Sequence, residues 1–301
     1  MVQVAAGQPA LARTALSGPI ERSRAQRVLA TSLREPRLLV FGLIILAMVF
    51  IAVFAPWLAP YDPIKPQPAI VLQAPSPSHL LGTDNLGRDQ LSRVIYGTRV
   101  SLLVAVIAVS IALGGGVAMG LAAGYVGGAV DQVLSRFVDA MLAFPGVLLA
   151  IAVTNALGPS LRNAMIAVGI IGIPLYFRLT RGQVLQARGH EYVTAAAVLG
   201  ASQVRILTRH IMPNIANPLI VAASISSSTA ILALAALSFI GIGPQPPDPD
   251  WGSMINAASG ALNRSPWLSF GPGLAIFLTV FSFSMLGDGL RDALDPRLRN
   301  R

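Results

Sequence analysis

Long stretches without a charged side chain alternate with short polar segments along this chain. A helix that crosses a bilayer needs roughly 17 to 25 mostly apolar residues. Five stretches are long enough and contain no Asp, Glu, Lys or Arg, namely 38–54, 100–130, 140–157, 215–247 and 265–287. A sixth apolar run, 163–177, is shorter and includes Gly169, Gly172 and Pro174. The pattern therefore predicts an all-α integral membrane protein with about six transmembrane helices.

The polar segments divide the chain into five predicted parts. Residues 1–37 form an N-terminal segment with a disordered start, 38–56 the first transmembrane helix, 57–99 an outer loop with a surface helix, 100–290 a five-helix core and 291–301 a tail. Within the core, we expect helices over 100–124, 138–157, 163–177, 214–240 and 265–286.

The outer part is rich in proline, with seven between Pro56 and Pro77. This density excludes an α-helix and favours an extended, semi-rigid path. Beyond it, Thr83 or Asp84 can cap a short helix on the outer surface. The shared apolar face of that helix would consist of Leu91, Val94 and Ile95. Near the end of the second helix, glycines at 114, 115, 116, 120 and 124 predict close helix packing, with a hinge as the alternative.

Composition agrees with a membrane protein. Hydrophobic residues make up 54% of the chain and charged residues 12%, against about 25% charged in soluble domains. There is no cysteine, which excludes disulfides and Cys-ligated metal sites. Basic residues precede 38–54 as in a secretory signal peptide, but 37 residues come before this run and five more runs follow. We therefore expect a retained first helix.

The basic residues are unevenly distributed. With six crossings and the N-terminus inside, sixteen of the 22 Lys and Arg fall in cytoplasmic segments. The six on the outer side are Lys65, Arg88, Arg93, Arg99, Arg162 and Arg264. This positive-inside bias predicts a multi-pass protein of the cytoplasmic membrane with both termini in the cytoplasm. Because no basic run is interleaved with aromatics, the net charge of +9 does not indicate nucleic-acid binding.

The longest predicted cytoplasmic segment between two helices, 178–213, contains EYVTAAAVLGASQVRILTRHIMP. Glu191 stands where a helix dipole favours an acid, and Gly200 can end that helix in a left-handed conformation. Ser202 can cap a second helix, which Pro213 is expected to stop. The segment therefore predicts two short helices joined by a bend.

Two interpretations of this bent pair remain open. Small residues at Ala195, Ala196 and Gly200 would permit close contact with a groove on a partner protein. Alternatively, Arg205 and Arg209 would hold an amphipathic helix on anionic lipid headgroups. Lipid binding usually uses Leu, Phe or Trp on the buried face, so the small residues favour the groove.

At these positions the chain resembles the "EAA" loop of binding-protein-dependent ABC importer permeases, in which E-A-A is followed by three residues, Gly, and then Ile-x-Leu-Pro. Ala195, Ala196, Gly200 and Pro213 are in register. The chain departs from this pattern at three positions and carries its acid earlier, at Glu191, in an E-Y-V-x-A-A form. The departures are Thr194, His210 and Met212.

Further motifs resemble the dipeptide/oligopeptide/nickel branch of that family. They are HLLGTDNLGRDQLSRVIYGTRVSL (79–102), RHIMPN (209–214) and LGDGLRDALDPRLR (286–299). The similarity covers about 33–299. The single extra first helix and the Pro-rich outer loop are similar to the "C" member of a permease pair.

The resemblance implies a type I ABC importer permease fold, a homologous permease as heterodimer partner, two ATP-binding subunits and an extracytoplasmic substrate-binding protein. It implies that ATP and Mg bind the partner subunits and that this chain carries no cofactor and no catalytic residue. The segment 189–213 would be the coupling helix that contacts an ATPase through Glu191, Tyr192, Ala195, Ala196, Gly200, Ala201, Arg205 and Pro213. In the outer loop, Asp84, Arg88 and Asp89 would contact the binding protein.

The remaining candidates for a metal or proton site are the histidines and two aspartates near the ends of predicted helices. The three histidines, His79, His190 and His210, lack metal-ligand spacing, and no GxxxxGK[ST] loop is present. Asp139 is interpreted as an interfacial ion pair with Arg136 in preference to a proton site, and Asp288 similarly.

A polar run, SISSSTA, lies inside the fifth predicted helix. Its hydroxyls can bond the helix's own carbonyls, which would be packing. They can also line a path for polar substrates, and this interpretation is favoured because the helix follows the coupling segment. The candidate lining residues are Ser224, Ser227 and Ser228.

Three functions compete. A membrane enzyme or respiratory-chain subunit lacks support because no cluster of His, Cys or buried carboxylates is present. A stand-alone secondary transporter or channel would have few helices and no reason for a bent cytoplasmic helix pair. An ATP-driven importer permease is favoured, with short peptides as the expected substrate and nickel or another small solute as the alternative.

Overall fold

A computed structural model of the chain describes residues 35–294, and the N-terminal segment 1–34 and residues 295–301 lie outside the described part. The expected disorder near the N-terminus falls in that outside part. The described chain is built from α-helices. They are α2 (Pro36–Leu58), α3 (Gln90–Val126), α4 (Gly128–Leu142), α5 (Gly146–Leu157), α6 (Leu161–Arg188), α7 (Glu191–Val198), α8 (Gln203–Arg205), α9 (Met212–Phe239), α10 (Trp251–Ser259) and α11 (Trp267–Leu294).

Five of these helical segments are long and apolar enough to cross a membrane. They are α2, α3, α6, the continuous stretch Gln203–Phe239 and α11. The predicted third span is not one straight helix, because α4 and α5 meet at an angle of 93°. Pro145 lies at this break, as the cap of α5. Counting the bent pair as one span gives six, in agreement with the sequence pattern.

The predicted surface helix and the second span form one helix, α3, of 37 residues. Its cap is Asp89, whose carboxylate accepts a hydrogen bond from the Ser92 backbone N–H at 2.8 Å. The prediction of a cap at Thr83 or Asp84 is therefore wrong. The Asp84 carboxylate instead accepts bonds from the Leu86 and Arg88 backbone N–H groups in the preceding turn.

Glycines bring α3 and α6 into close contact. A Cβ atom at Gly116, Gly120 or Gly124 would lie 2.5 to 2.8 Å from side-chain atoms of α6. These three positions are four residues apart, so they share one face of the helix. The expectation of packing is confirmed for them, whereas Gly114 faces open space.

The two helices flanking the predicted coupling segment are longer than expected. Helix α6 continues to Arg188 rather than ending near Phe177. Pro213 does not stop the second short helix, because a π-helical turn at Ile206–Ile211 carries the chain from α8 directly into α9. Pro213 is in the first turn of α9, where a missing N–H is tolerated. The last span also extends beyond Leu286, to Leu294.

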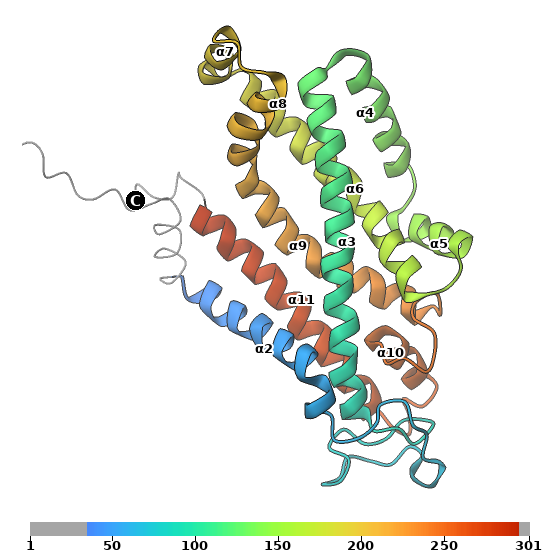
Figure 1. Cartoon of the computed structure of the whole chain (residues 1–301). Helices are drawn as coiled ribbons and strands as arrows, with labels where there is room; N and C mark the ends of the chain where they lie inside the picture. The colour runs from blue at the N-terminus through green and yellow to red at the C-terminus, as the bar shows by residue number, and fades with distance from the viewer. Residues whose placement is uncertain (1–34, 295–301) are drawn as a thin grey trace, which may run out of the picture.

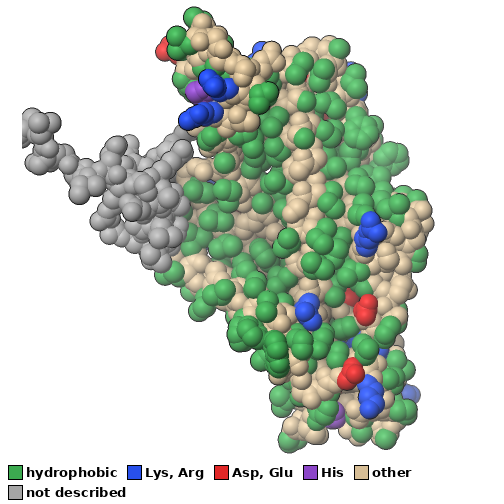
Figure 2. Space-filling view, viewed as in Figure 1, with side chains coloured by type: hydrophobic (Ala, Val, Ile, Leu, Met, Phe, Trp, Pro, Cys, Tyr) green, Lys and Arg blue, Asp and Glu red, His purple; other side chains and the backbone are tan. Residues whose placement is uncertain are grey.

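The bundle has two distinct ends (Figure 1). Helices α7 and α8 form one end, and the loop between α2 and α3, together with α10, lies at the other. That loop contains one short 3-10 turn, Pro68–Ile70, and is otherwise without helix, as its prolines predict. Between the ends, a core of small and aliphatic residues lies among α3, α5, α6 and α9. Hydrophobic side chains cover much of the face in Figure 2, while Lys, Arg and His side chains are seen at both ends of the molecule.

Candidate functional site

The segment between α6 and α9 forms a helical elbow, defined here as residues 190–211. Helix α7 ends at Val198, and Gly200 follows with a φ of 79°. The Ser202 hydroxyl then caps α8 by accepting a bond from the Arg205 backbone N–H at 3.4 Å. The predicted bend at Gly200 and the cap at Ser202 are both present. The left-handed backbone at Gly200 is readily adopted only by glycine.

Buried aliphatic residues attach the elbow to the bundle. Val193, Ile206 and Ile211 are buried in one cluster with Tyr176 and Val184 of α6. Ala196 and Ala201 are partly buried against the same cluster. These two alanines therefore contribute to internal packing. Ala195 and Gly200 of the predicted small-residue face are exposed, and the contact of that face with a partner stays a prediction.

The exposed tip of the elbow is apolar. Val198 is 82% exposed, Leu199 86% and Val204 69%. Large aliphatic side chains this exposed at the end of a helix indicate a contact surface. Val198 and Leu199 are not among the contact residues predicted from the sequence, although they end an uninterrupted apolar run, 195–199.

Most of the other candidate contact residues of the elbow are exposed. Glu191, Ala195, Gly200 and Arg205 are exposed. The Tyr192 hydroxyl accepts a hydrogen bond from Asn214 Nδ2 at 3.1 Å, which joins α7 to the start of α9, and its ring stacks on His190. Pro213 is also exposed on the first turn of α9. The elbow thus presents an apolar tip with charged residues beside it.

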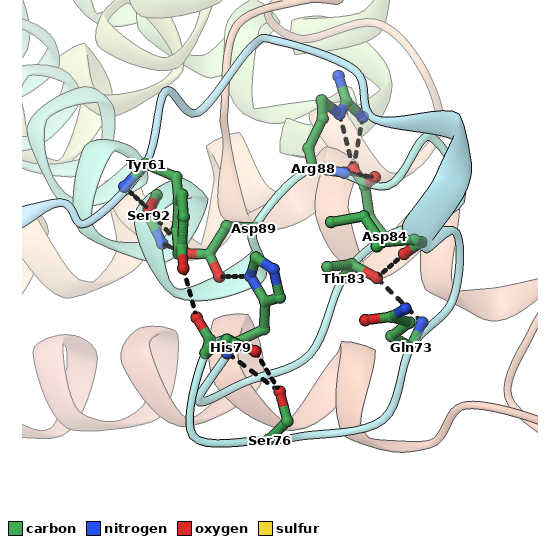
Figure 3. A network of polar contacts seen from close by, with 11 residues as sticks. Tyr61, Gln73, Ser76, His79, Thr83, Asp84, Arg88, Asp89 and Ser92 are labelled. Atoms are coloured by element: carbon green, nitrogen blue, oxygen red, sulfur yellow. Dashed lines mark hydrogen bonds and ion pairs between the residues drawn. The ribbon is translucent and has the colours of Figure 1, made fainter.

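At the opposite end, the predicted docking residues of the outer loop are buried. Asp84, Arg88 and Asp89 are each less than 10% exposed. Asp84 Oδ2 accepts from Arg88 Nε at 2.7 Å (Figure 3). The same oxygen lies 3.6 Å from Arg93 Nε. These side chains bind the loop to itself and are mostly buried, so they shape its surface, and their predicted contact with a binding protein stays a prediction.

A second polar group fixes the start of α3. Asp89 accepts bonds from the Ser92 N–H and hydroxyl, and its other oxygen is 2.9 Å from His79 Nδ1 (Figure 3). The His79 ring lies against the Tyr61 ring, with centroids 4.7 Å apart and planes tilted by 34°. The loop is therefore closed over the first turn of α3.

The outer loop is also tied to the segment before α10. Arg93 donates to the Pro63 carbonyl at 2.8 Å and to the Pro247 carbonyl at 3.4 Å. Asp250 caps α10 through the Ser253 backbone N–H at 3.0 Å. Burial raises the pKa of the Asp250 carboxyl, and the hydrogen bonds from Ser253 and others only partly oppose this. The loop between α2 and α3 and the segment 247–253 are distant in sequence but are joined by these bonds. They are called the outer platform below.

The candidate pore serines lie at a helix contact. Ser224 donates to the Phe283 carbonyl and Ser228 to the Val280 carbonyl of α11, each at 3.0 Å, while Ser227 bonds to Ala223 within α9. This geometry corresponds to the packing alternative, and the preferred pore lining stays a prediction. The hydroxyl hydrogens of Ser224 and Ser228 are used in contacts between α9 and α11.

Ion pairs join α4 to α6. Asp139 pairs with Arg178 at 3.0 Å rather than with Arg136, and both partners are more than half exposed. Arg181 holds Asp131 with two bonds, one of 2.7 Å. The interfacial ion pair expected for Asp139 is present with a different partner, because the reverse bend after α3 turns α4 toward α6. Asp288 is half-buried on α11.

Comparison with known proteins defines the family. The profile described as binding-protein-dependent transport system inner membrane component matches residues 116–300, and that of the N-terminal TM domain of oligopeptide transport permease C matches residues 23–75. The chain is 45% identical to the dipeptide transport system permease protein DppC of Alkalihalophilus pseudofirmus, over 89% of this chain and 88% of that protein.

Other relatives agree. The di/tripeptide transport system permease protein DppC of Pseudomonas aeruginosa is 46% identical over 86% of this chain and 87% of its own length. The glutathione transport system permease protein GsiD of Pectobacterium atrosepticum is 42% identical over 89% of each chain. Among solved structures, the inward-facing MetNI methionine ABC transporter matches with a TM-score of 0.53 at 15% identity, covering 67% of this chain and 97% of that chain.

These findings, with the helical bundle and its elbow, define an inner-membrane permease of the type I ABC importer fold. The chain belongs to the binding-protein-dependent transport system inner membrane component family, and within it to the permeases that carry the oligopeptide permease C N-terminal domain. Membership in this family implies partner ATPase and substrate-binding proteins.

Proposed function

We propose that this chain is one half of the translocation channel of an ATP-driven importer that carries short peptides into the cytoplasm. It would pair with one homologous permease, contact one of two ATP-binding subunits through the elbow, and receive substrate from a binding protein at the outer platform. Both termini would lie on the cytoplasmic side, as the distribution of arginine indicates.

The observation that carries the proposal is the elbow itself. Its tip exposes Val198, Leu199 and Val204, while its base is packed between α6 and the start of α9. A short helix whose apolar side chains enter a groove is a common mode of recognition. Because both neighbouring helices cross the membrane, a shift of the elbow moves two spans together. The elbow is therefore suited to transmit a conformational change.

ATP and Mg are assigned to the partner subunits in this proposal. The sequence has no phosphate-binding loop of the GxxxxGK[ST] type. This chain would bind its partners, form part of the transport path and change conformation. ATP hydrolysis would take place on the ATP-binding subunits. Lipid contacts the apolar outer faces of helices such as α2, where Leu43 and Leu46 are exposed.

Peptides are the proposed substrate because three relatives of more than 40% identity are named for dipeptide, di/tripeptide and glutathione transport. Nickel or another small solute is the alternative within the same branch. Uptake of a labelled dipeptide by cells with and without the gene, in the presence of excess unlabelled dipeptide or Ni²⁺, separates the two. Competition by Ni²⁺ and not by dipeptide would overturn the peptide assignment.

The coupling role is tested with the variant Leu199→Glu. Leu199 makes little contact within the chain, so the change leaves the fold intact while placing a charge in an apolar contact. We expect tagged Leu199→Glu, purified in mild detergent, to lose most of its ATPase subunits. ATP-driven dipeptide uptake should fall at least about tenfold, since a buried unpaired charge costs several kcal/mol.

The matched control is Leu80→Glu, which makes the same change on the outer loop at a side chain that is 63% exposed. It should retain the ATPase subunits. If Leu199→Glu keeps ATPase and uptake at the level of this control, the elbow is only a surface helix at the lipid headgroups and the proposed coupling role fails.

A further inference from the structure

A cavity of about 370 Å³ lies between α3, α5, α6 and α9. Its walls are mostly small and aliphatic, with Ala108, Gly172 and Ala230 on three different helices, and no charged residue lines it. The lining positions fall near the middle of α3, α6 and α9. The cavity therefore lies in the middle of the membrane-spanning part. Secondary transporters with discontinuous helices bind their substrates at this depth.

The break between α4 and α5 is at the mouth of this cavity. Gly146 and Val147, the first two residues of α5, line it, and both are exposed. The preceding cap residue is Pro145, and no side chain caps the helix. The first backbone N–H groups of a helix carry partial positive charge and lack partners within the helix. An uncapped twelve-residue helix thus begins at the opening of an uncharged cavity.

The wall also contains polar groups without a partner. Tyr176 of α6 and Ser226 of α9 line the cavity, and Tyr176 is fully buried while Ser226 is 9% exposed. The two hydroxyls approach each other, but neither makes a hydrogen bond of normal geometry within the described part of the chain. Buried hydroxyls are normally bonded, so this pair keeps hydrogen-bonding capacity that another molecule can use once either side chain moves.

Resting on the proposed function, we propose that this cavity is a subsite on the transit path for the carboxyl end of a peptide. The terminal carboxylate lies at the first turn of α5, and the last side chain enters the cavity. Movement of Ser226 or Tyr176 allows their hydroxyls to bond the last peptide group. The site has no cationic side chain, so it guides the carboxylate with helix N–H groups alone, which lets the peptide leave again.

The position of the cavity couples it to the elbow. Tyr176 and Gly172 belong to α6, and Ser226 and Ala230 to α9, the two helices that leave the elbow on either side. Tyr176 lies twelve residues before the end of α6 at Arg188, which is about 18 Å along the helix. Any change in the angle between α6 and α9 alters the width of the cavity. The subsite is therefore placed to hold or release the peptide in step with the elbow.

The carboxylate contact is tested with Val147→Glu against Val147→Gln in the full importer, reconstituted with its ATPase, partner permease and binding protein in liposomes. An acid in the first turn of a helix is favourable for the fold, so the Glu variant should assemble as well as the Gln variant. Because its charge repels the peptide carboxylate, uptake of Ala-Gly and Ala-Leu should fall at least about tenfold relative to Gln.

The side-chain pocket is tested with Gly146→Leu against Gly114→Leu. A Cβ atom at either glycine meets no atom within 4 Å, but only Gly146 lines the cavity. Gly146→Leu should lower uptake of Ala-Leu about tenfold while leaving Ala-Gly within about threefold, since a filled pocket excludes the larger side chain. Gly114→Leu should transport both peptides like wild type.

Wild-type uptake is measured first, because its absence would overturn the proposed function and this subsite with it. With wild type active, equal uptake by the two Val147 variants overturns the subsite. So does equal selectivity of Gly146→Leu and Gly114→Leu. Loss of the partner permease from Gly146→Leu, with both peptides affected alike, would instead show that a partner helix fills the cavity.

Discussion

The charged residues of the outer loop are buried and hold the loop together, whereas charged residues of a loop are usually exposed to solvent. Asp84 lies between Arg88 and Arg93, and all three are less than 10% exposed. Their charges satisfy one another and the backbone of the turn. Together with the backbone hydrogen bonds of the loop, such as Thr83 N–H to the Gln73 carbonyl, this buried network gives the loop a fixed shape.

Asp84→Ala tests that role. Removing one partner of a buried ion pair leaves two guanidinium groups without their carboxylate, which costs about 3–5 kcal/mol. We expect a clear fall in the thermal unfolding midpoint of the purified protein in detergent. Asp62→Ala is the matched control in the same loop, because Asp62 is exposed and bonds only the nearby Ile64 N–H. Equal midpoints for the two variants would contradict the structural role of Asp84.

At this scale, the sequence predicted local geometry well and burial poorly. The bend at Gly200 and the cap at Ser202 depend on a few neighbouring residues, and both are present. The burial of Asp84 and Asp89 depends on a loop closing over the start of α3 and against Pro247, 154 residues from Arg93. Nothing local in the sequence signals that closure, so charged loop residues were expected to be exposed.

Among the described elements, α3 and α6 make the most extensive contact between two helices. Three glycines on α3 face backbone and side-chain atoms of α6. In a membrane, where lipid tails are as apolar as side chains, close backbone approach supplies much of the attraction between helices. The pair thus connects the outer platform, at the start of α3, to the elbow, at the end of α6.

Gly120→Ala would disturb this contact. The new Cβ atom would lie 2.7 Å from Thr180 Cβ and 2.8 Å from the Phe177 carbonyl oxygen, so the helices must move apart. We expect a loss of about 1–3 kcal/mol, typical of overpacking, seen as a lower unfolding midpoint in detergent. Gly114→Ala on the same helix meets nothing within 4 Å, and it should be neutral or stabilising by up to about 1 kcal/mol. The same loss in both variants would argue against specific packing.

The elements themselves followed from hydropathy, but their joints did not. Six apolar runs predicted about six spans, and five long helices with one bent pair are present. The run 140–157 conceals the break at Pro145, because apolar letters on both sides of a turn look the same as one helix. The prediction that Pro213 ends a helix was wrong. The π-helical turn before Pro213 lets the helix continue through a residue type that often ends a helix.

For the whole molecule, the two ends identify opposite sides of the membrane. The elbow end carries Arg188, Arg205 and Arg209, while the other end carries the closed loop and α10. From the positive-inside tendency we propose that the elbow lies in the cytoplasm. This orientation is what the proposed import direction requires.

Since the chain has no cysteine, single substitutions report on orientation directly. Leu80 on the outer loop is 63% exposed and Val126 at the elbow end 62%. In spheroplasts, a membrane-impermeant maleimide should label Leu80→Cys at once and Val126→Cys only after the membrane is opened. The reverse order would show that the elbow faces outward and would exclude docking of cytoplasmic ATPases.

The continuous helix from Gln203 to Phe239 has a mechanical consequence. Its 37 residues span about 55 Å at 1.5 Å per residue, so a tilt of about 10° at the elbow carries the far end through roughly 10 Å. That end is packed against α10, whose Trp251 donates to the Val94 carbonyl of α3. One lever arm therefore runs from the inner tip to the outer platform. Because coupling between two binding sites is reciprocal, binding at either end of this helix changes the binding affinity at the other end.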